Sequence, residues 1–148
     1  RNVHAVMIGE HGDSELPVYS QASIGTENLE KVLERRNNPN DLQELEKIHQ
    51  EVRNAAYEII NRKGVTNFGI GMALTRITKA ILNNENSILT VSCPLDGLYG
   101  QENIYMSVPA VVNRDGIREI IEIDLNEKEK EQFEKSAQAL RDASKSIF

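Results

Sequence analysis

The fold is decided by the stretch Ile104-Tyr105-Met106-Ser107-Val108-Pro109-Ala110-Val111-Val112-Asn113-Arg114-Asp115-Gly116-Ile117-Arg118-Glu119-Ile120-Ile121-Glu122-Ile123. Its branched and apolar runs, Ile104 to Val112 and Ile117 to Ile123, are typical of β-strands, and Asn113 to Gly116 are typical of a tight turn. Strands joined by so short a turn run antiparallel. A further strand is predicted upstream, at Ile88 to Val91. The second half of the chain therefore predicts an antiparallel meander.

Two helices are expected before this meander. A capping box that begins at Asn40 or Asp41 predicts the start of the first helix, and Gly64 suits its left-handed end. The expected buried face of this helix consists of Leu42, Leu45, Ile48, Val52, Ala56, Ile59 and Ile60. A second helix should follow Thr66 directly, with an apolar face of Ile70, Leu74, Ile77 and Ile81. The two helices would meet at an elbow, residues 64–66, where side chains could face a ligand.

The two ends of the chain complete the pattern. Val3 to Ile8 predicts a strand, and Leu16 to Ile24 predicts a second, weaker extended segment. Asn126 with Glu129 predicts a capping box that opens the last helix. Its buried stripe is expected at Phe133, Ala137, Leu140 and Ile147. Because strands come in runs and do not alternate strictly with helices, the expected class is α+β, with a mostly antiparallel sheet and long helices in a single domain.

Composition restricts the class of protein further. Of 148 residues, 39% are hydrophobic and 27% are charged, as in an ordinary globular domain. The net charge of -6 argues against nucleic acid or an anionic membrane as the main partner. No stretch approaches the roughly 18 apolar residues of a membrane span, and the single Cys93 cannot form an internal disulfide, so we expect a cytoplasmic protein. Because the chain lacks an initiator Met and its first apolar run starts at Val3, we also expect a fragment of something longer.

Histidine is the side chain that exchanges protons near neutral pH without help from its surroundings, and the chain has three: His4, His11 and His49. His49 is interpreted as a surface or half-buried helix residue, and His4 as a packed or interface residue. His11 differs, because it lies on a turn between Gly9 and Gly12, at the end of a predicted strand, where catalytic groups are often placed. From the residues alone, a catalytic loop and a plain polar turn both remain open.

Other kinds of site lack the residues they need. His11 has no second histidine or cysteine at metal-binding spacing, so no metal site is expected. Ser14 is not part of the Gly-x-Ser-x-Gly turn of a nucleophilic serine. Gly69-Ile70-Gly71 begins like a dinucleotide-binding fingerprint, but Leu74 stands where the third glycine belongs, so helix packing is the better interpretation.

Several segments carry a family resemblance, in the expected order along nearly the whole chain. They are Ile8-Gly9-Glu10-His11-Gly12-Asp13-Ser14-Glu15-Leu16-Pro17-Val18-Tyr19-Ser20, Val52-Arg53-Asn54-Ala55-Ala56-Tyr57-Glu58-Ile59-Ile60, Lys63-Gly64-Val65-Thr66, Ile77-Thr78-Lys79-Ala80-Ile81-Leu82 and Val108-Pro109-Ala110-Val111-Val112-Asn113-Arg114. These segments resemble the C-terminal, substrate-side domain of the L-lactate dehydrogenases. The related malate dehydrogenases usually lack the glutamate before the histidine and the Glu-Leu-Pro run after it, so Glu10 and Glu15 favour lactate.

The resemblance implies an NAD-dependent interconversion of lactate and pyruvate in glycolysis or fermentation. It implies that His11 accepts the proton of the lactate hydroxyl and returns it to the pyruvate carbonyl. Thr66 matches a threonine that lines the substrate pocket, and Ile70 matches a residue near the nicotinamide. His4 matches a position that helps to bind fructose 1,6-bisphosphate at a subunit interface of allosteric bacterial members. The family resemblance also suggests a homotetramer.

The resemblance also implies what should precede Arg1: the nucleotide-binding domain, the arginine that holds the substrate carboxylate, the aspartate partner of the histidine, and the mobile loop. The fragment alone is therefore expected to be inactive and to bind NAD negligibly. Three other interpretations remain open: a malate or other 2-hydroxyacid dehydrogenase domain, a non-catalytic oligomerisation or effector-binding module, and a plain α+β domain.

Overall fold

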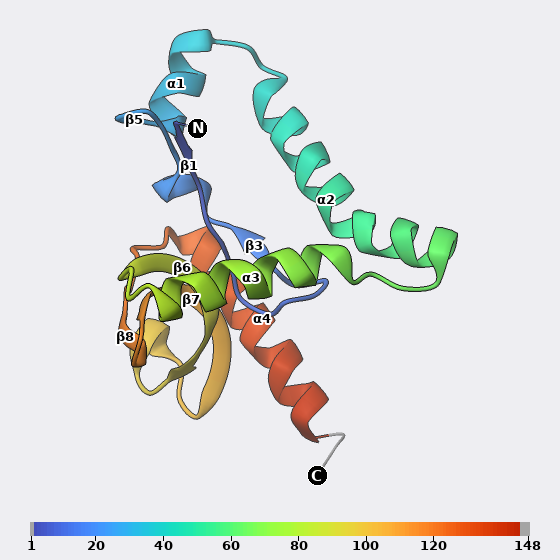
Figure 1. The fold of residues 1–148 in the computed structure, drawn as a ribbon. Helices are drawn as coiled ribbons and strands as arrows, with labels where there is room; N and C mark the ends of the chain where they lie inside the picture. Colours follow the sequence, from blue (N-terminus) through green and yellow to red (C-terminus); the bar gives the residue numbers. More distant parts are fainter. Residues whose placement is uncertain (1, 146–148) are drawn as a thin grey trace.

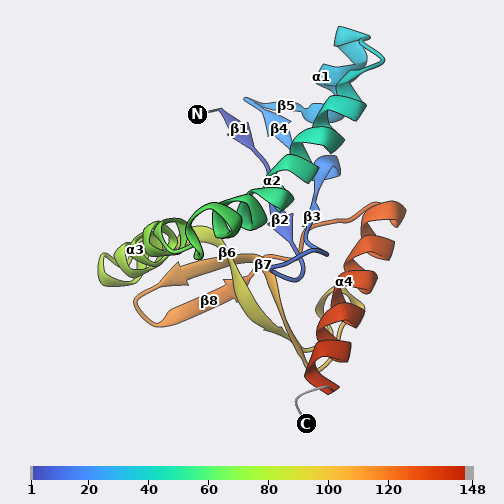
Figure 2. The same cartoon turned by 90° about the vertical axis from the view of Figure 1, so that its right-hand side faces the viewer.

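Three antiparallel strands form the main sheet of the structure, a computed structural model that describes residues 2–145. Strands β6 (Ser87–Leu95), β7 (Ile104–Asn113) and β8 (Gly116–Ile120) lie in the order β6-β7-β8, with Leu89 opposite Ala110 (Figure 1 and Figure 2). The predicted meander and the α+β class are confirmed, although the last strand ends at Ile120 and not at Ile123 as predicted. The first strand is longer than expected, because its pairing with β7 continues to Leu95 opposite Ile104.

The predicted single strand from Val3 to Ile8 is wrong, because its two halves pair with different partners. Strand β1 (Val3–His4) pairs with β4 (Ser23–Ile24), which pairs in turn with β5 (Glu27–Asn28). Strand β2 (Met7–Ile8) pairs with β3 (Leu16–Pro17). The weaker segment predicted from Leu16 to Ile24 is likewise interrupted, by a short 3-10 turn at residues 19–21.

Helix α1 (Leu29–Arg36) was not expected from the sequence. The Asn28 side chain accepts a hydrogen bond from the Glu30 N–H at 2.8 Å, which caps the first turn. Asn37 ends the helix in a left-handed conformation with φ of 50°. Both asparagines are helix-end residues, but eight residues are too few for apolar periodicity to reveal a helix between them.

Helices α2 (Asp41–Lys63) and α3 (Phe68–Leu82) form the predicted pair, and Gly64 ends α2 with φ of 81° as expected. The predicted capping box at the start of α2 is wrong. Asn40 has a right-handed helical conformation and its side chain makes no capping bond. The Asn38 side chain holds this start of the helix, accepting from the Asn40 N–H and donating to the Asp41 carboxylate.

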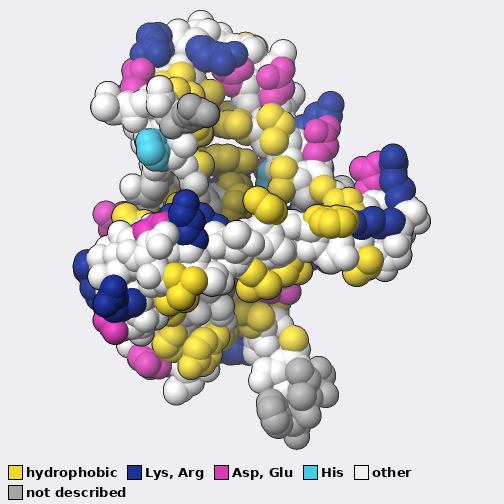
Figure 3. Space-filling view, in the orientation of Figure 1, with side chains coloured by type: hydrophobic (Ala, Val, Ile, Leu, Met, Phe, Trp, Pro, Cys, Tyr) yellow, Lys and Arg dark blue, Asp and Glu magenta, His cyan; other side chains and the backbone are white. Residues whose placement is uncertain are grey.

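The apolar faces predicted for α2 and α3 are mostly exposed, contrary to expectation. The exposed members are Leu42, Ile48, Val52, Ala56, Ile59, Ile60, Ile70 and Leu74. Figure 1 shows the elbow between the two helices projecting away from the main sheet, and Figure 3 shows hydrophobic side chains gathered along them. Amphipathic periodicity predicts that a helix face is apolar but does not specify what covers it.

Helix α4 (Glu127–Lys145) closes the core, and its predicted capping box is confirmed. The Asn126 side chain accepts from the Glu129 N–H at 2.9 Å, and Glu129 accepts from the Asn126 N–H at 3.0 Å. Of the predicted stripe, Phe133 and Ala137 are buried and Leu140 packs against the core, while Ile147 lies outside the described residues. The core beneath α4 includes Ile8, Leu16, Leu95, Met106 and Val108.

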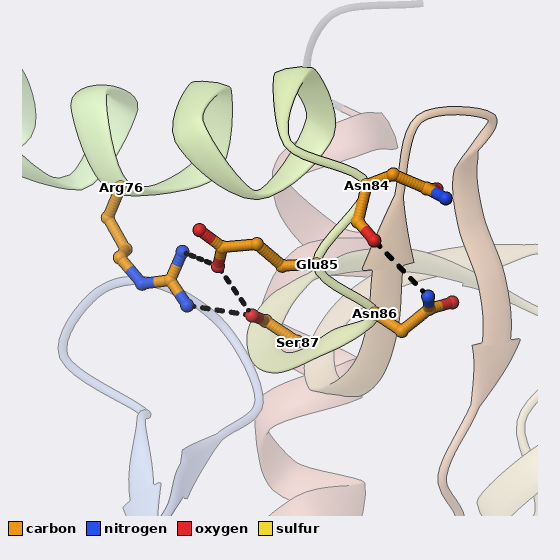
Figure 4. A network of polar contacts seen from close by, with 5 residues as sticks. All are labelled: Arg76, Asn84, Glu85, Asn86 and Ser87. Atoms are coloured by element: carbon orange, nitrogen blue, oxygen red, sulfur yellow. Dashed lines mark hydrogen bonds and ion pairs between the residues drawn. The ribbon is translucent and has the colours of Figure 1, made fainter.

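A polar network fixes the turn between α3 and β6 (Figure 4). The Arg76 guanidinium donates to Glu85 at 2.7 Å and to Ser87 at 2.8 Å, and Ser87 donates to the same carboxylate. The hydrogen bond from Ser87, and to a smaller extent the one from Arg76, lowers the pKa of Glu85. This end of α3 is thereby held against the sheet.

Within residues 2–145, each helix is too short or too polar to cross a membrane.

Candidate active site

The loop that carries His11 is anchored at its first residue to the central strand. Gly9 and Ser107 of β7 exchange two backbone hydrogen bonds, each 2.9 Å long. Gly9 has φ of 100°, and a β-carbon there would lie 2.6 Å from the Ser136 hydroxyl oxygen of α4. Only glycine allows this backbone conformation together with so close a helix. The loop therefore starts from a fixed point between the sheet and α4.

The His11 side chain is exposed, and it does not pack against aliphatic neighbours in the core. It lies at a cavity of about 360 Å³, lined also by Ala5, Val6, Met7, Ile8, Glu10, Glu15, Thr90 and Ser107. Within the described part of the chain, the imidazole has no hydrogen-bond partner. A ring presented in this way can exchange a proton with a molecule that enters the cavity.

The two carboxylates beside His11 face other residues. Glu10 turns back along the loop, where its carboxylate accepts hydrogen bonds from the N–H and the hydroxyl of Ser14. Asp13 accepts from the Tyr57 phenol of α2, at 2.9 Å and 3.0 Å. Neither carboxylate therefore orients the imidazole through a hydrogen bond.

Tyr57 links the His11 loop to the long helix. The hydrogen bond to Asp13, reinforced by the charge of that carboxylate, raises the pKa of the Tyr57 phenol. No local pattern singles out this tyrosine, because its partner is 44 residues away along the chain. The bond holds α2, which leads to the elbow, against the loop.

The predicted substrate and cofactor residues, Thr66 and Ile70, lie in the elbow and on the first turn of α3, and neither is part of the His11 cavity. Thr66 is half-buried just before α3, and Ile70 is 55% exposed on the first turn of that helix. Neither residue lines the His11 cavity. The structure therefore does not bring the predicted substrate and cofactor residues together with His11 in one cavity.

The other two histidines lie elsewhere. His4 is exposed on β1, opposite Ser23 of β4. His49 is half-buried on α2, and its Nε2 has no hydrogen-bond partner among the described residues. Among residues 2–145, no group of three His, Cys, Asp or Glu side chains is arranged to hold a metal ion.

A larger cavity of about 930 Å³ lies between α4 and the turn at Tyr99. Tyr99 and Phe133 form an aromatic pair at its wall, with ring centroids 5.0 Å apart. None of the predicted site residues lines it. Its size therefore does not indicate where the chemistry takes place, and the smaller cavity at His11 is the better candidate.

Comparisons with known proteins agree with this fold. All of residues 1–148 match the family described as the lactate/malate dehydrogenase, alpha/beta C-terminal domain. The chain is 56% identical over 142 residues to "L-lactate dehydrogenase 2" of Bacillus cereus strain ZK / E33L, covering 96% of this chain and 45% of that protein. It is 57% identical over 141 residues to "L-lactate dehydrogenase 1" of Peribacillus psychrosaccharolyticus, covering 95% of this chain and 44% of the relative.

Solved structures of a lactate dehydrogenase and a malate dehydrogenase also match this chain. The ligand-bound minor L-lactate dehydrogenase of Enterococcus mundtii matches with a TM-score of 0.90 and 43% identity, covering 100% of this chain and 47% of that one. The malate dehydrogenase of Aeropyrum pernix matches with a TM-score of 0.86 and 32% identity, covering 98% and 46%. This chain thus spans about half the length of its relatives. It belongs to the lactate/malate dehydrogenase family and corresponds to the C-terminal domain of that family.

Proposed function

We propose that this chain is the C-terminal catalytic domain of a cytoplasmic, NAD-dependent L-lactate dehydrogenase. The observation that carries the proposal is the exposed His11 imidazole, on a loop fixed to β7 and α4 and open to a cavity. The relatives named L-lactate dehydrogenase support the choice of reaction. The preceding part of the longer protein would supply the nucleotide-binding domain, the arginine for the substrate carboxylate and the aspartate for His11.

His11 would move one proton in each direction of the reaction. In lactate oxidation, a neutral ring nitrogen accepts the hydroxyl proton while the C–H hydride leaves. In pyruvate reduction, the imidazolium hydrogen-bonds the carbonyl oxygen and donates its proton to the forming alkoxide. The cofactor, when bound, would accept this hydride as NAD⁺ in lactate oxidation and supply it as NADH in pyruvate reduction. Because the loop is fixed at Gly9, the backbone that carries the ring keeps one position in both directions.

The residues of the elbow and of the first turn of α3 fit part of a nicotinamide site. Ile70 and Phe68 present exposed apolar side chains on the first turn of α3, as a wall beside a flat ring requires. Such a wall excludes water from the path of the hydride. Thr66, half-buried at the elbow, would line the substrate pocket. The chain therefore contributes one wall, and the dinucleotide phosphates would be held by the preceding domain.

The exposed apolar faces of α2 and α3 would be covered in the longer protein by its other domain and by neighbouring subunits of a homotetramer. Exposed apolar surface of this extent is uncommon on a free-standing domain. His4, exposed on β1, would take part in fructose 1,6-bisphosphate binding at a subunit interface. The 148-residue chain alone should show no pyruvate reduction, because its His11 lacks an orienting carboxylate.

Malate dehydrogenase is the second candidate, since the Aeropyrum pernix enzyme shares the fold. The test is NADH oxidation by the full-length protein with pyruvate or with oxaloacetate as substrate. We expect kcat/KM for pyruvate to exceed that for oxaloacetate by about a hundredfold or more. A preference for oxaloacetate would assign the chain to the malate enzymes, and activity with neither would favour the non-catalytic module.

A further inference from the structure

We propose that Ser136 of α4 is a positioning residue for His11. Its hydroxyl takes part in a hydrogen-bonded ring that sets the path of the loop on both sides of the histidine. The catalytic consequence rests on the proposed function of His11, whereas the ordering of the loop does not.

Ser136 contacts the loop at two points that bracket His11. The Glu10 N–H donates to the Ser136 hydroxyl oxygen at 2.7 Å. The Ser14 hydroxyl oxygen lies 3.2 Å from the same atom. One buried side chain therefore holds the residue before His11 and the residue three positions after it. Ser136 itself is fully buried, with 0% of its surface exposed.

The protons in this ring have one consistent order. The Ser14 hydroxyl donates to the Glu10 carboxylate, so its oxygen is left to accept. The Ser136 hydroxyl must then donate to Ser14 while it accepts from the Glu10 N–H. The ring runs from Glu10 through Ser136 and Ser14 back to Glu10, and each hydroxyl both donates and accepts. Removing the Ser136 hydroxyl breaks two of its bonds.

The helix that carries Ser136 is itself firmly placed. Phe133 and Ala137, on either side in the sequence, are buried in the core. Glu129, one turn before Phe133, accepts from the N–H and the hydroxyl of Ser20 at 3.0 Å and 2.6 Å. The loop is thus held to the sheet at Gly9 and to a fixed helix at Glu10 and Ser14. A shift of about 1 Å in a catalytic group can reduce a rate by about a hundredfold, so this second attachment matters for the His11 ring.

The experiment compares Ser136→Ala with Ser144→Ala in the full-length protein. Ser144 is exposed near the end of the same helix and serves as the matched control. The first measurement is hydrogen exchange of the Glu10 amide, which does not depend on activity. The second is kcat for pyruvate, normalised to the number of NADH-binding sites found by titration, so that misfolded protein does not lower the value.

We expect Ser136→Ala to speed exchange at Glu10 by about tenfold or more and to lower kcat per site by about tenfold to a hundredfold. Ser144→Ala should change neither. Ser14→Ala should lower kcat in the same direction, and the double variant should lose less than the product of the two single losses, because both hydroxyls belong to one ring. Ser136→Thr retains the hydroxyl and should recover most of kcat even if its melting temperature falls.

Unchanged exchange at Glu10 in Ser136→Ala would overturn the inference, and so would a kcat per site within about twofold of the original. If the parent protein reduces no 2-oxoacid while Glu10 exchange responds as expected, the proposed function fails and the ordering of the loop stands.

Discussion

The phenol of Tyr57 donates to both carboxylate oxygens of Asp13, at 2.9 Å and 3.0 Å, and so joins helix α2 to the loop of His11. Asp13 is two residues after the histidine, and Tyr57 is two turns before the elbow that carries Thr66. The loop of His11 and the elbow of Thr66, which line no common cavity, are therefore connected through the Tyr57–Asp13 pair. The bond stabilises the protonated phenol.

Asp13→Asn should lower the pKa of Tyr57 toward its ordinary value of 10.0, because the amide lacks the charge that retains the phenol proton. In the original chain the raised pKa stabilises the folded state below about pH 10, and this contribution is lost as the pH rises through the folded-state value. The measurement is an ultraviolet titration of the phenols, with Tyr57→Phe identifying the Tyr57 step. An identical titration curve for the Asp13→Asn protein would contradict the role of this carboxylate.

Gly9→Ala should destabilise the fold by about 2–3 kcal/mol, because its β-carbon meets Ser136 in addition to the strain of a positive φ. Gly25→Ala is the control, since Gly25 also has a positive φ, of 66°, but no atom lies within 4 Å of the added carbon. It should lose only about 1 kcal/mol. Thermal denaturation of the two variants measures the difference, and equal losses would show that the contact with Ser136 has no energetic weight.

Glu129→Ala should lower stability by about 3 kcal/mol, since it leaves the Asn126 and Ser20 N–H groups without their buried acceptor. Glu127→Ala, in the same turn of α4, removes an exposed carboxylate and should leave the melting temperature nearly unchanged. Equal melting temperatures for the two variants would contradict the role of Glu129 in anchoring α4.

Local patterns predicted the elements whose causes are local. The turn at residues 113–116 with its flanking apolar runs predicted the meander, and Asn126 with Glu129 predicted the start of α4. Gly64 likewise predicted the end of α2. Each of these depends on residues within a few positions of one another. A short stretch of sequence is therefore enough to predict each of these three features.

Distant contacts could not be predicted in this way. Ser136 meets Glu10 across 126 positions, and no periodicity relates the two. The break between β1 and β2 arises because each half pairs with a different strand. The apolar face of α2 was predicted correctly as apolar, but apolar periodicity does not specify whether another surface covers that face, and the structure leaves it exposed. His11 was found through its family signature, since its glycine-flanked turn alone left two interpretations open.

The most direct test of the account is the turnover of the full-length protein carrying His11→Asn, with His49→Asn as the matched control. His49 loses no hydrogen bond at Nε2 on substitution. If His11 transfers the proton, His11→Asn should lower kcat/KM for pyruvate by about a thousandfold or more while NADH binding persists, and His49→Asn should stay near the original value. Near-normal turnover of His11→Asn would contradict the proposed catalytic role.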